Sequence, residues 1–460
     1  MKTFTHLYFL GIGGIGMSSL AEYFLSEGYQ VAGYDREASD RCKHLEKLGV
    51  QVVYDAAAEA IPATFRDAKH TRVVFTPAVP KHHPQRIFFA EAGFTMKKRA
   101  EVLGAIVNPR FGIAVAGSHG KTSVSSYIAY LLSLTEIPFH AFIGGIARNF
   151  NSNLVLNPGS NWVLAEADEF DRSFLQLFPN IAVVTSLDAD HLDVYGHWSD
   201  VKAAFQDFVR QIKADGALVV HQSVADYFEA DPEIDLITYG SEPNADVSIR
   251  NVRVERNAYW VDIYLPDNEI WKDCKVHLPG RVNLENALAM ISVAWLLDIP
   301  ESVVRETLAG FMGVKRRFDY RIKTPQLIYI DDYAHHPAEI QASLASVREL
   351  YPHKKISLVF QPHLYSRTRD FASEFAAALS TADEVFLLDI YPAREEPIPG
   401  VSSELILSQL DASKAQVIAR EELIATLKQS NLEVLITMGA GNIDALVEPI
   451  VQELKKAFHL

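Results

Sequence analysis

The segment 117–122 has the residue types needed to bind a nucleoside triphosphate. It follows an apolar run at 112–116 and precedes a helix-like stretch, the strand–loop–helix context of a P-loop. We expect its backbone amides to cradle phosphates, Lys121 to neutralise them and the Thr122 hydroxyl to bind Mg²⁺. Position 115 is Val, so the match is to a shorter variant of the general pattern. The sequence therefore predicts ATP and Mg²⁺ as cofactors, held by Gly117, Ser118, His119, Gly120, Lys121, Thr122 and Ser123.

A second glycine-rich loop, Gly-Ile-Gly-Gly-Ile-Gly at 11–16, follows an apolar run at 6–10. Its glycines let backbone amides and a helix N-terminus approach a diphosphate. Asp35 lies about 20 residues on, where a ribose-binding acid is expected. Taken alone, this loop suits a dinucleotide dehydrogenase as well as any other nucleotide binder. A dehydrogenase needs only one such loop, so two loops in separate domains indicate ATP and a second phosphate-bearing ligand.

Two further candidates follow strand-like runs next to the P-loop. Glu166 ends the run 162–165, and His191 lies just beyond 181–185. Ligands collect at the carboxyl ends of parallel strands, so both side chains are expected to face the P-loop. Because Mg²⁺ prefers oxygen, the sequence favours Glu166 over His191 as a direct ligand. Together with Thr122, these residues form the predicted metal site.

Polar segments also end two strand-like runs in the last third of the chain. They are Asp-Asp-Tyr-Ala-His-His-Pro at 331–337 and Gln-Pro-His-Leu-Tyr-Ser-Arg-Thr-Arg at 361–369. Arg367 and Arg369 have the fork geometry that binds phosphate or carboxylate. The plain alternative is a set of solvated loop charges beside a domain interface.

The elements that must position these residues are short apolar runs separated by helix-like stretches, a pattern typical of parallel α/β sheets. We predict three α/β domains: a Rossmann-like domain at 1–108, a central P-loop ATPase-type domain at 109–317 and a Rossmann-like domain at 318–460. A polar, alternating region at about 231–275 is expected to add antiparallel strands to the central domain. The expected strands are 6–10, 29–33, 51–54, 72–75, 111–116, 162–165, 181–185, 327–330, 356–360 and 434–437.

The composition of the 460 residues is that of a globular protein, with 48% hydrophobic and 22% charged residues. A formal charge of −15 argues against a broad surface for nucleic acid or anionic membrane. The two cysteines, Cys42 and Cys274, are far apart, so neither a disulfide framework nor a thiolate metal site is expected. The apolar stretch ending at Leu10 is too short for a signal peptide or membrane span, which favours a cytoplasmic protein. The sequence does not indicate the oligomeric state.

Across essentially its whole length, the chain resembles the Mur ligase family, and within it the alanine-adding members. The segments that carry this resemblance are GIGGIGMS (11–18), GSHGKT (117–122), EADEFDRSF (166–174), DADHLD (188–193), PGRVNLENALA (279–289), GVKRRFD (313–319), DDYAHHPAEI (331–340), FQPHLYSRTRD (360–370) and DIYPAREEPIPG (389–400). The resemblance implies ATP-dependent joining of L-alanine to UDP-N-acetylmuramate through an acyl phosphate, in peptidoglycan precursor synthesis.

The resemblance also implies roles for individual residues. The first glycine loop would hold UDP rather than NAD, and the P-loop would hold ATP. The implied substrate residues are Gly13, Gly14, Ile15, Gly16, Asp35, Arg99, Asp168, His336, His363 and Arg367. Asn283 and Asn286 match adenine-side asparagines, Arg317 a phosphate-contacting arginine and Asp332 a ribose-contacting acid. The implied catalytic residues are Lys121, Glu166, His191 and His335.

Three departures from the family pattern stand out: Ser118 replaces Thr, Val282 replaces a His, and Leu364 replaces an Arg. Three alternatives remain open from the sequence. One is a ligase of the same family that accepts a recycled peptide, another is an NAD-dependent dehydrogenase, and the third is a nucleotide-dependent binding protein without ligase activity.

Overall fold

The computed structural model describes residues 4–188, 195–229, 233–255, 258–278, 280–393 and 395–460. Its chain forms two compact units. The first contains 1–252, 261–275 and 285–311, and the second contains 253–260, 276–284 and 312–460. His191, predicted to support the metal, lies outside the described residues.

The N-terminal sheet of the first unit has five parallel strands in the order β3-β2-β1-β4-β5. Most residues of its central strands are buried, as expected for apolar runs covered on both faces. The glycine loop follows β1, where the strand order reverses, and this switch point is where ligands bind in such sheets. The elements are β1 (His6–Leu10), α1 (Ile15–Ser26), β2 (Gln30–Tyr34), α2 (Asp40–Lys47), β3 (Gln51–Val53), β4 (Thr71–Phe75), α3 (Pro84–Glu91), β5 (Thr95–Lys98) and α4 (Arg99–Val107).

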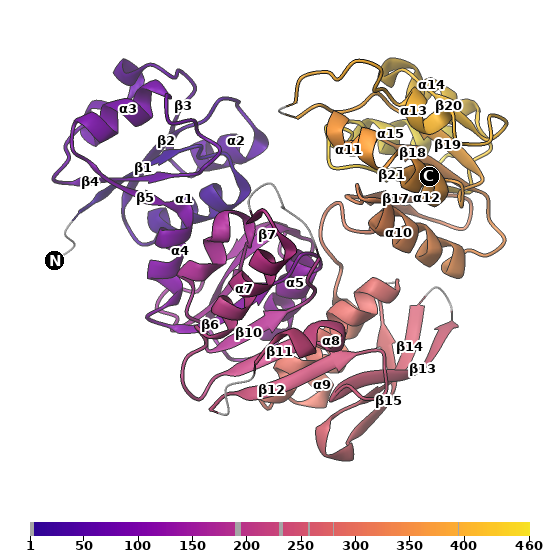
Figure 1. The fold of residues 1–460 in the computed structure, drawn as a ribbon, viewed down its shortest axis with the longest axis horizontal. Helices are drawn as coiled ribbons and strands as arrows, with labels where there is room; N and C mark the ends of the chain where they lie inside the picture. The colour runs from indigo at the N-terminus through magenta and orange to yellow at the C-terminus, as the bar shows by residue number, and fades with distance from the viewer. Residues whose placement is uncertain (1–3, 189–194, 230–232, 256–257, 279, 394) are drawn as a thin grey trace. The chain divides into compact units, whose positions relative to one another are not determined.

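The central sheet has ten strands in the order β15-β14-β13-β12-β11-β10-β6-β9-β7-β8 (Figure 1). From β7 to β12 its neighbours run parallel, and β6 lies between β9 and β10. The elements are β6 (Phe111–Ala116), α5 (Lys121–Ser133), β7 (Phe139–Ala147), β8 (Ser152–Val155), β9 (Trp162–Glu166), β10 (Ile181–Val184), α7 (Trp198–Val209), β11 (Ala217–His221), β12 (Asp235–Gly240), β13 (Val247–Glu255), β14 (Ala258–Tyr264), β15 (Ile270–Val276), α8 (Arg281–Leu296) and α9 (Glu301–Gly310).

Packing of α1 against β7 joins the two sheets of the first unit. The Tyr23 ring lies 5.4 Å from that of His140 and 5.6 Å from that of Phe142. The Asn153 side-chain amide donates to the Ile15 carbonyl over 2.9 Å. The start of α1, which follows the glycine loop, is thereby anchored to the central sheet.

The second unit contains a six-stranded sheet, β16-β17-β21-β18-β19-β20, in which only the β16–β17 pair is antiparallel among the pairings described. Its strands β17, β18 and β21 are buried throughout. The elements are β16 (Asp319–Lys323), β17 (Ile328–Asp332), α10 (Pro337–Leu350), β18 (Ile356–Phe360), α11 (Tyr365–Asp370), α12 (Ala372–Leu379), β19 (Glu384–Leu387), α13 (Glu404–Leu407), β20 (Ala415–Val417), α14 (Arg420–Gln429), β21 (Val434–Met438) and α15 (Asp444–Ala457).

The predicted α/β class and the strands listed above are confirmed, and each sheet falls within one of the predicted domain ranges. The exact boundaries stay predictions. The expectation of antiparallel strands in 231–275 is wrong for β12, which pairs in parallel with both β11 and β13 and continues the central sheet. Among the described residues, no helix has the length and apolar character to cross a membrane.

Candidate functional site

The P-loop connects β6 to α5 through two glycines whose conformations other residues rarely adopt. Gly117 has φ +136°, and a Cβ there would lie 2.1 Å from Thr185 Oγ1. Gly120, the N-cap of α5, has φ +84° and contributes no side-chain cap. The amides of the first turn therefore have no capping side chain before them, and a helix N-terminus in this state suits an anion.

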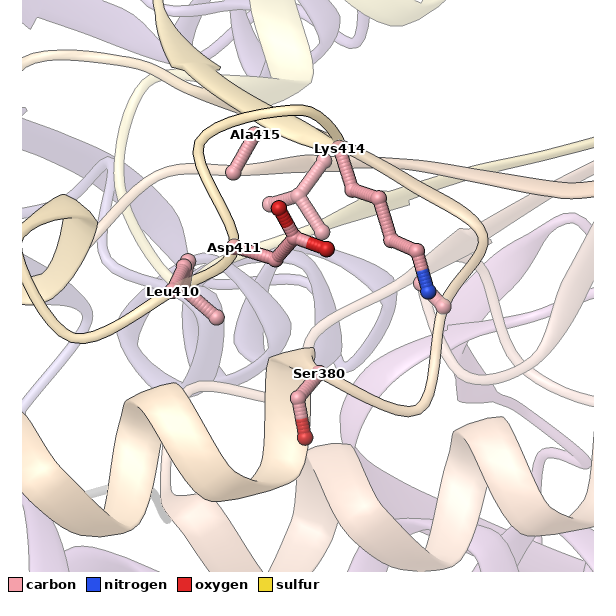
Figure 2. A pocket seen from close by; sticks show the side chains of 7 residues that line it. Ser380, Leu410, Asp411, Lys414 and Ala415 are labelled. Carbon is pink, nitrogen blue, oxygen red and sulfur yellow. The ribbon is translucent and has the colours of Figure 1, made fainter.

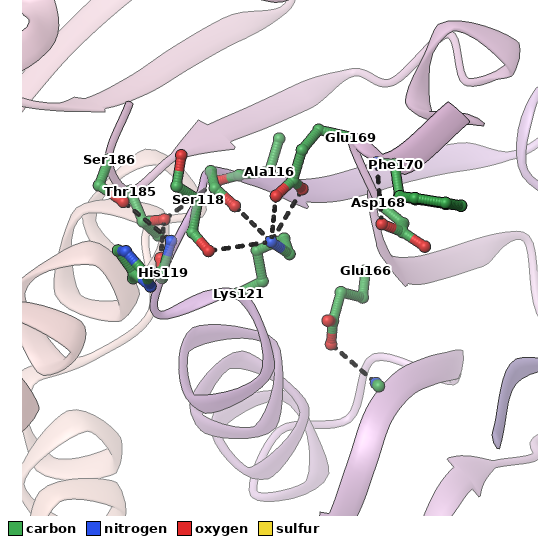
Figure 3. A network of polar contacts seen from close by, with 12 residues as sticks. Ala116, Ser118, His119, Lys121, Glu166, Asp168, Glu169, Phe170, Thr185 and Ser186 are labelled. Carbon is green, nitrogen blue, oxygen red and sulfur yellow. Dashed lines mark hydrogen bonds and ion pairs between the residues drawn. The ribbon is translucent and has the colours of Figure 1, made fainter. Parts of the chain in front are cut away.

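Lys121 lies at the centre of a polar network in this loop (Figure 3). Its ammonium donates to the Gly117 carbonyl over 2.5 Å and to the Ser118 carbonyl over 3.3 Å. It also pairs with both carboxylate oxygens of Glu169, at 2.9 and 2.8 Å. Burial raises the pKa of Glu169, and the charge of Lys121 opposes that shift. Glu169 was not among the residues predicted from the sequence, although it lies in the segment 166–174 that carries part of the family resemblance.

Thr122 and Glu166, two residues of the metal site predicted from the sequence, are in direct contact. The Thr122 hydroxyl donates to Glu166 Oε1 over 3.1 Å, and the Gly144 amide donates to Oε2 over 2.7 Å. Burial raises the pKa of Glu166, while Lys121 again acts in the opposite direction. A hydroxyl and a carboxylate are the hard oxygen donors that Mg²⁺ prefers. Among the described residues, no group of three or more acidic, His or Cys side chains completes a metal site.

The segment after β10 supports the other side of the loop. The Ser118 amide donates to the Ser186 carbonyl and the His119 amide to Ser186 Oγ, at 3.0 and 2.9 Å. The Asp188 carboxylate lies 3.3 Å from His119 Nε2. The Thr185 hydroxyl bonds to the His119 carbonyl. Ser118 and His119 are thus held by segment 185–188, which the sequence reasoning had not connected to them. Ser123 is buried in the first turn of α5.

The two predicted adenine-side asparagines have different surroundings. Asn286 is buried, and its Oδ1 would lie 2.8 Å from a Cβ on Gly120. It therefore borders the P-loop. Asn283 belongs to the second unit, where its amide donates to the Gly280 carbonyl over 3.0 Å. Val282, which replaces a histidine of the family pattern, is 52% exposed.

The glycine loop of the N-terminal sheet is tied to residues after β2. Asp35 accepts the Gly13 amide over 2.7 Å, and Arg41 donates to the Gly13 carbonyl over 2.6 Å. Gly14 is the N-cap of α1 and makes no side-chain cap, so Ile15 and Gly16 begin an open helix N-terminus. Asp35 therefore contacts the loop itself, and Arg41 is a basic neighbour that the sequence reasoning missed.

Arg99 and Asp168 form an ion pair between the two sheets of the first unit. Arg99 Nη2 donates to Asp168 Oδ2 over 3.1 Å. The Nη1 atom of the same guanidinium would lie 2.8 Å from a Cβ on Gly16. These two predicted substrate residues are therefore brought together next to the glycine loop.

In the second unit, Asp332 ends β17 as a buried carboxylate that accepts the Ser343 hydroxyl over 2.6 Å. Burial raises its pKa, opposed first by this hydrogen bond and then by the charge of Arg317. The Arg317 guanidinium lies 5.1 Å from the centre of the Tyr333 ring. Asp332 and Arg317 thus both lie at the junction where β17 passes into the following loop.

His335, His363 and Arg367 gather at the ends of β17 and β18. The two imidazoles lie 6.0 Å apart, and His335 Nδ1 is 3.0 Å from the Tyr333 carbonyl. Burial lowers the pKa of His335, and burial with the charges of His335 and Arg367 lowers that of His363 to about 4. His363 Nδ1 and Arg367 Nη1 are buried without a hydrogen-bond partner in the described part of the chain. Unpaired buried polar groups of this kind suit a polar ligand.

His336 makes different contacts from those of His335, His363 and Arg367. Its ring is 5.2 Å from Phe371, and it lines a pocket of about 360 Å³ with Gln341 and Glu374. A second pocket of about 120 Å³ lies between Ser380 and the segment 410–415 (Figure 2). None of the predicted site residues lines this second pocket.

Three family models match successive parts of the chain. They are described as Mur ligase family, catalytic domain (residues 6–110), Mur ligase middle domain (115–294) and Mur ligase, glutamate ligase domain (316–441). The UDP-N-acetylmuramate–L-alanine ligase of Parabacteroides distasonis is 44% identical over 98% of both chains. The enzyme of the same name from Flavobacterium psychrophilum is 45% identical, also over 98% of both chains.

The crystal structure of the UDP-N-acetylmuramate–alanine ligase of Thermotoga maritima superposes with a TM-score of 0.84 at 26% identity, covering 98% of this chain and 99% of that one. A murein peptide ligase of Psychrobacter arcticus reaches a TM-score of 0.67 at 21% identity, covering 98% of each chain, and so is similar in fold. From these full-length matches and the arrangement of its P-loop, the chain belongs to the Mur ligase family.

Proposed function

We propose that this protein uses Mg-ATP to join L-alanine to the carboxylate of UDP-N-acetylmuramate, a step in making peptidoglycan precursors. The observation that carries the proposal is the similarity to alanine-adding ligases, at 44 and 45% identity over 98% of the chain. The contacts of Lys121, Thr122 and Glu166 fit a site for triphosphate and metal. Membership of the Mur ligase family disfavours a dehydrogenase. In a ligase the two phosphate loops serve two different ligands, whereas a dehydrogenase has a use for only one of them.

In the proposed reaction, a muramoyl carboxylate oxygen attacks the γ-phosphorus of ATP, releasing ADP and leaving an acyl phosphate. Lys121 would neutralise charge on the transferred oxygens, and Thr122 and Glu166 would hold Mg²⁺, which lowers the barrier by further neutralisation. The alanine amine then attacks the acyl carbon, phosphate leaves, and the amine loses a proton. Because burial lowers its pKa, His335 would be uncharged near neutral pH and able to accept that proton.

Two further aspects belong to the same proposal. Asp35, Arg99 and the glycine loop would hold the UDP portion, and Arg367 with His363 would hold the muramoyl carboxylate and alanine. We place the protein in the cytoplasm, because both of its cysteines are free and buried, which suits a reducing compartment. Recovery of the protein from a cell fraction other than the cytoplasm would contradict this location.

The test is ADP release with UDP-N-acetylmuramate, Mg-ATP and each candidate amine offered separately, with the product mass measured in parallel. ADP formed with L-alanine and a product heavier by one alanyl residue is the expected result. Turnover with a peptide alone would favour the recycling ligase, and no turnover with any amine would favour a binding protein. Lys121→Ala is the control: it should lose ADP release while retaining binding of the UDP-sugar.

A further inference from the structure

An unbroken series of neighbouring residues connects the two phosphate loops of the first unit. The Arg99 guanidinium lies against Gly16 through Nη1 and donates to Asp168 through Nη2, over 3.1 Å. The next residue, Glu169, pairs with Lys121 at 2.8 Å. Two adjacent carboxylates therefore hold Lys121 of the P-loop and Arg99, which lies against the glycine loop.

The segment that carries these carboxylates is fixed at several points. The Ala167 amide donates to the Val115 carbonyl of β6 over 2.8 Å. The Tyr195 hydroxyl donates to the Glu169 carbonyl over 2.6 Å. Asp171 and Arg172 follow with φ of 53° and 54°, a strained conformation that persists only where surrounding contacts impose it. A change in order at Asp168 is therefore transmitted to Glu169 by the backbone.

Arg99 can bind a diphosphate and Asp168 together. A guanidinium presents five N–H donors in a fixed fork, and here the donor facing Gly16 differs from the one used by Asp168. A diphosphate at the glycine loop would take the first without breaking the second. Such a bridged arginine loses freedom, and so does the segment that it holds.

We propose that Asp168 and Glu169 are positioning residues that couple binding of the UDP diphosphate to binding of the ATP phosphates. A ligand at either loop restrains its cation and, through the Arg99–Asp168 and Lys121–Glu169 pairs, the side chains of 168 and 169, so the second ligand has less side-chain ordering to impose. The coupling is positive, and each ligand raises the affinity for the other by the same factor. This inference rests on the proposed function, because it assigns UDP to the glycine loop and ATP to the P-loop.

The experiment measures the Kd of Mg-ADP by calorimetry, with and without saturating UDP. These probes lack the γ-phosphate and the muramoyl carboxylate, so direct contact between reacting groups cannot produce the coupling. For the unaltered protein we expect UDP to tighten ADP binding about fivefold or more. In Asp168→Asn and Glu169→Gln the factor should fall to about one, since each change removes one ion pair of the series.

The matched control is Asp171→Asn. Asp171 pairs with Lys98 at 2.9 Å, so it joins the same segment to the start of α4, and among the described residues it makes no hydrogen bond or ion pair with either loop. This variant should keep the coupling. Coupling that is absent from the unaltered protein, unchanged in Asp168→Asn or lost equally in Asp171→Asn would overturn the inference. Failure of UDP or ADP to bind at all would instead overturn the proposed function.

Discussion

Replacing Lys121 by Met should destabilise the protein, because it leaves the buried carboxylate of Glu169 without its counter-ion. Glu169 is only 4% exposed, and its carboxylate has Lys121 as its counter-ion at 2.8 Å. Removing one member of a buried pair costs about 3–5 kcal/mol, because the other charge stays in a poorly solvated place. We therefore expect the free energy of unfolding to fall by about that amount.

Adding Glu169→Gln to Lys121→Met removes the unpaired buried carboxylate and should restore about half of this stability. What remains is the loss of hydrogen bonds to the Gly117 and Ser118 carbonyls, about 1 kcal/mol each. The double variant should therefore be more stable than the single one by about 2 kcal/mol.

The assay is denaturant unfolding of the unaltered protein, the single variant and the double variant. It is run at about pH 7.5, roughly one unit above the ordinary pKa of histidine, and ADP release is measured on the same samples. Both variants should lack ADP release, because neither retains the ammonium. If Lys121→Met proves as stable as the unaltered protein, or if Glu169→Gln brings no recovery, the buried ion pair does not have the energetic role assigned to it.

Three other predictions concern the loops and one buried acid. Gly117→Ala should abolish ADP binding, because its Cβ would meet Thr185 Oγ1 at 2.1 Å, whereas Gly159→Ala, at φ +81° in open space, should leave binding intact; calorimetry distinguishes them. Glu166→Gln should raise the Mg²⁺ concentration needed for half-maximal ADP release about tenfold or more, and an unchanged Mg²⁺ titration would remove Glu166 from the metal site. Burial raises the pKa of Asp331 to about 6, above its ordinary value of 3.8, so its protonated form favours the folded state. Stability from this group is full below the unfolded pKa and is lost as pH rises through about 6, by up to about 3 kcal/mol, and unfolding of Asp331→Asn should lack that part of the pH dependence.

Local sequence patterns were sufficient to predict the fold class and the strand ends at which the candidate site residues lie. Apolar runs such as 6–10 and 356–360 became buried strands because parallel strands are covered on both faces. Polar residues at the ends of such strands lie together at the carboxyl edges of the sheets. Thr122 contacts Glu166 in the central sheet, and His335 lies near His363 in the sheet of the second unit. The strand β5, Thr-Met-Lys-Lys, was not predicted, because it lies at the edge of its sheet and has little apolar character.

Only the tertiary structure decided which side chains face each other across these loops. Lys121 and Glu169 are 48 residues apart, and their pairing depends on how β9 lies beside β6. In the same way, Asp35 turned out to accept the Gly13 amide, and Thr185 to limit the space at Gly117. Periodicity fixes which face of a strand a residue occupies, whereas the partner it meets depends on the packing of segments distant in the chain.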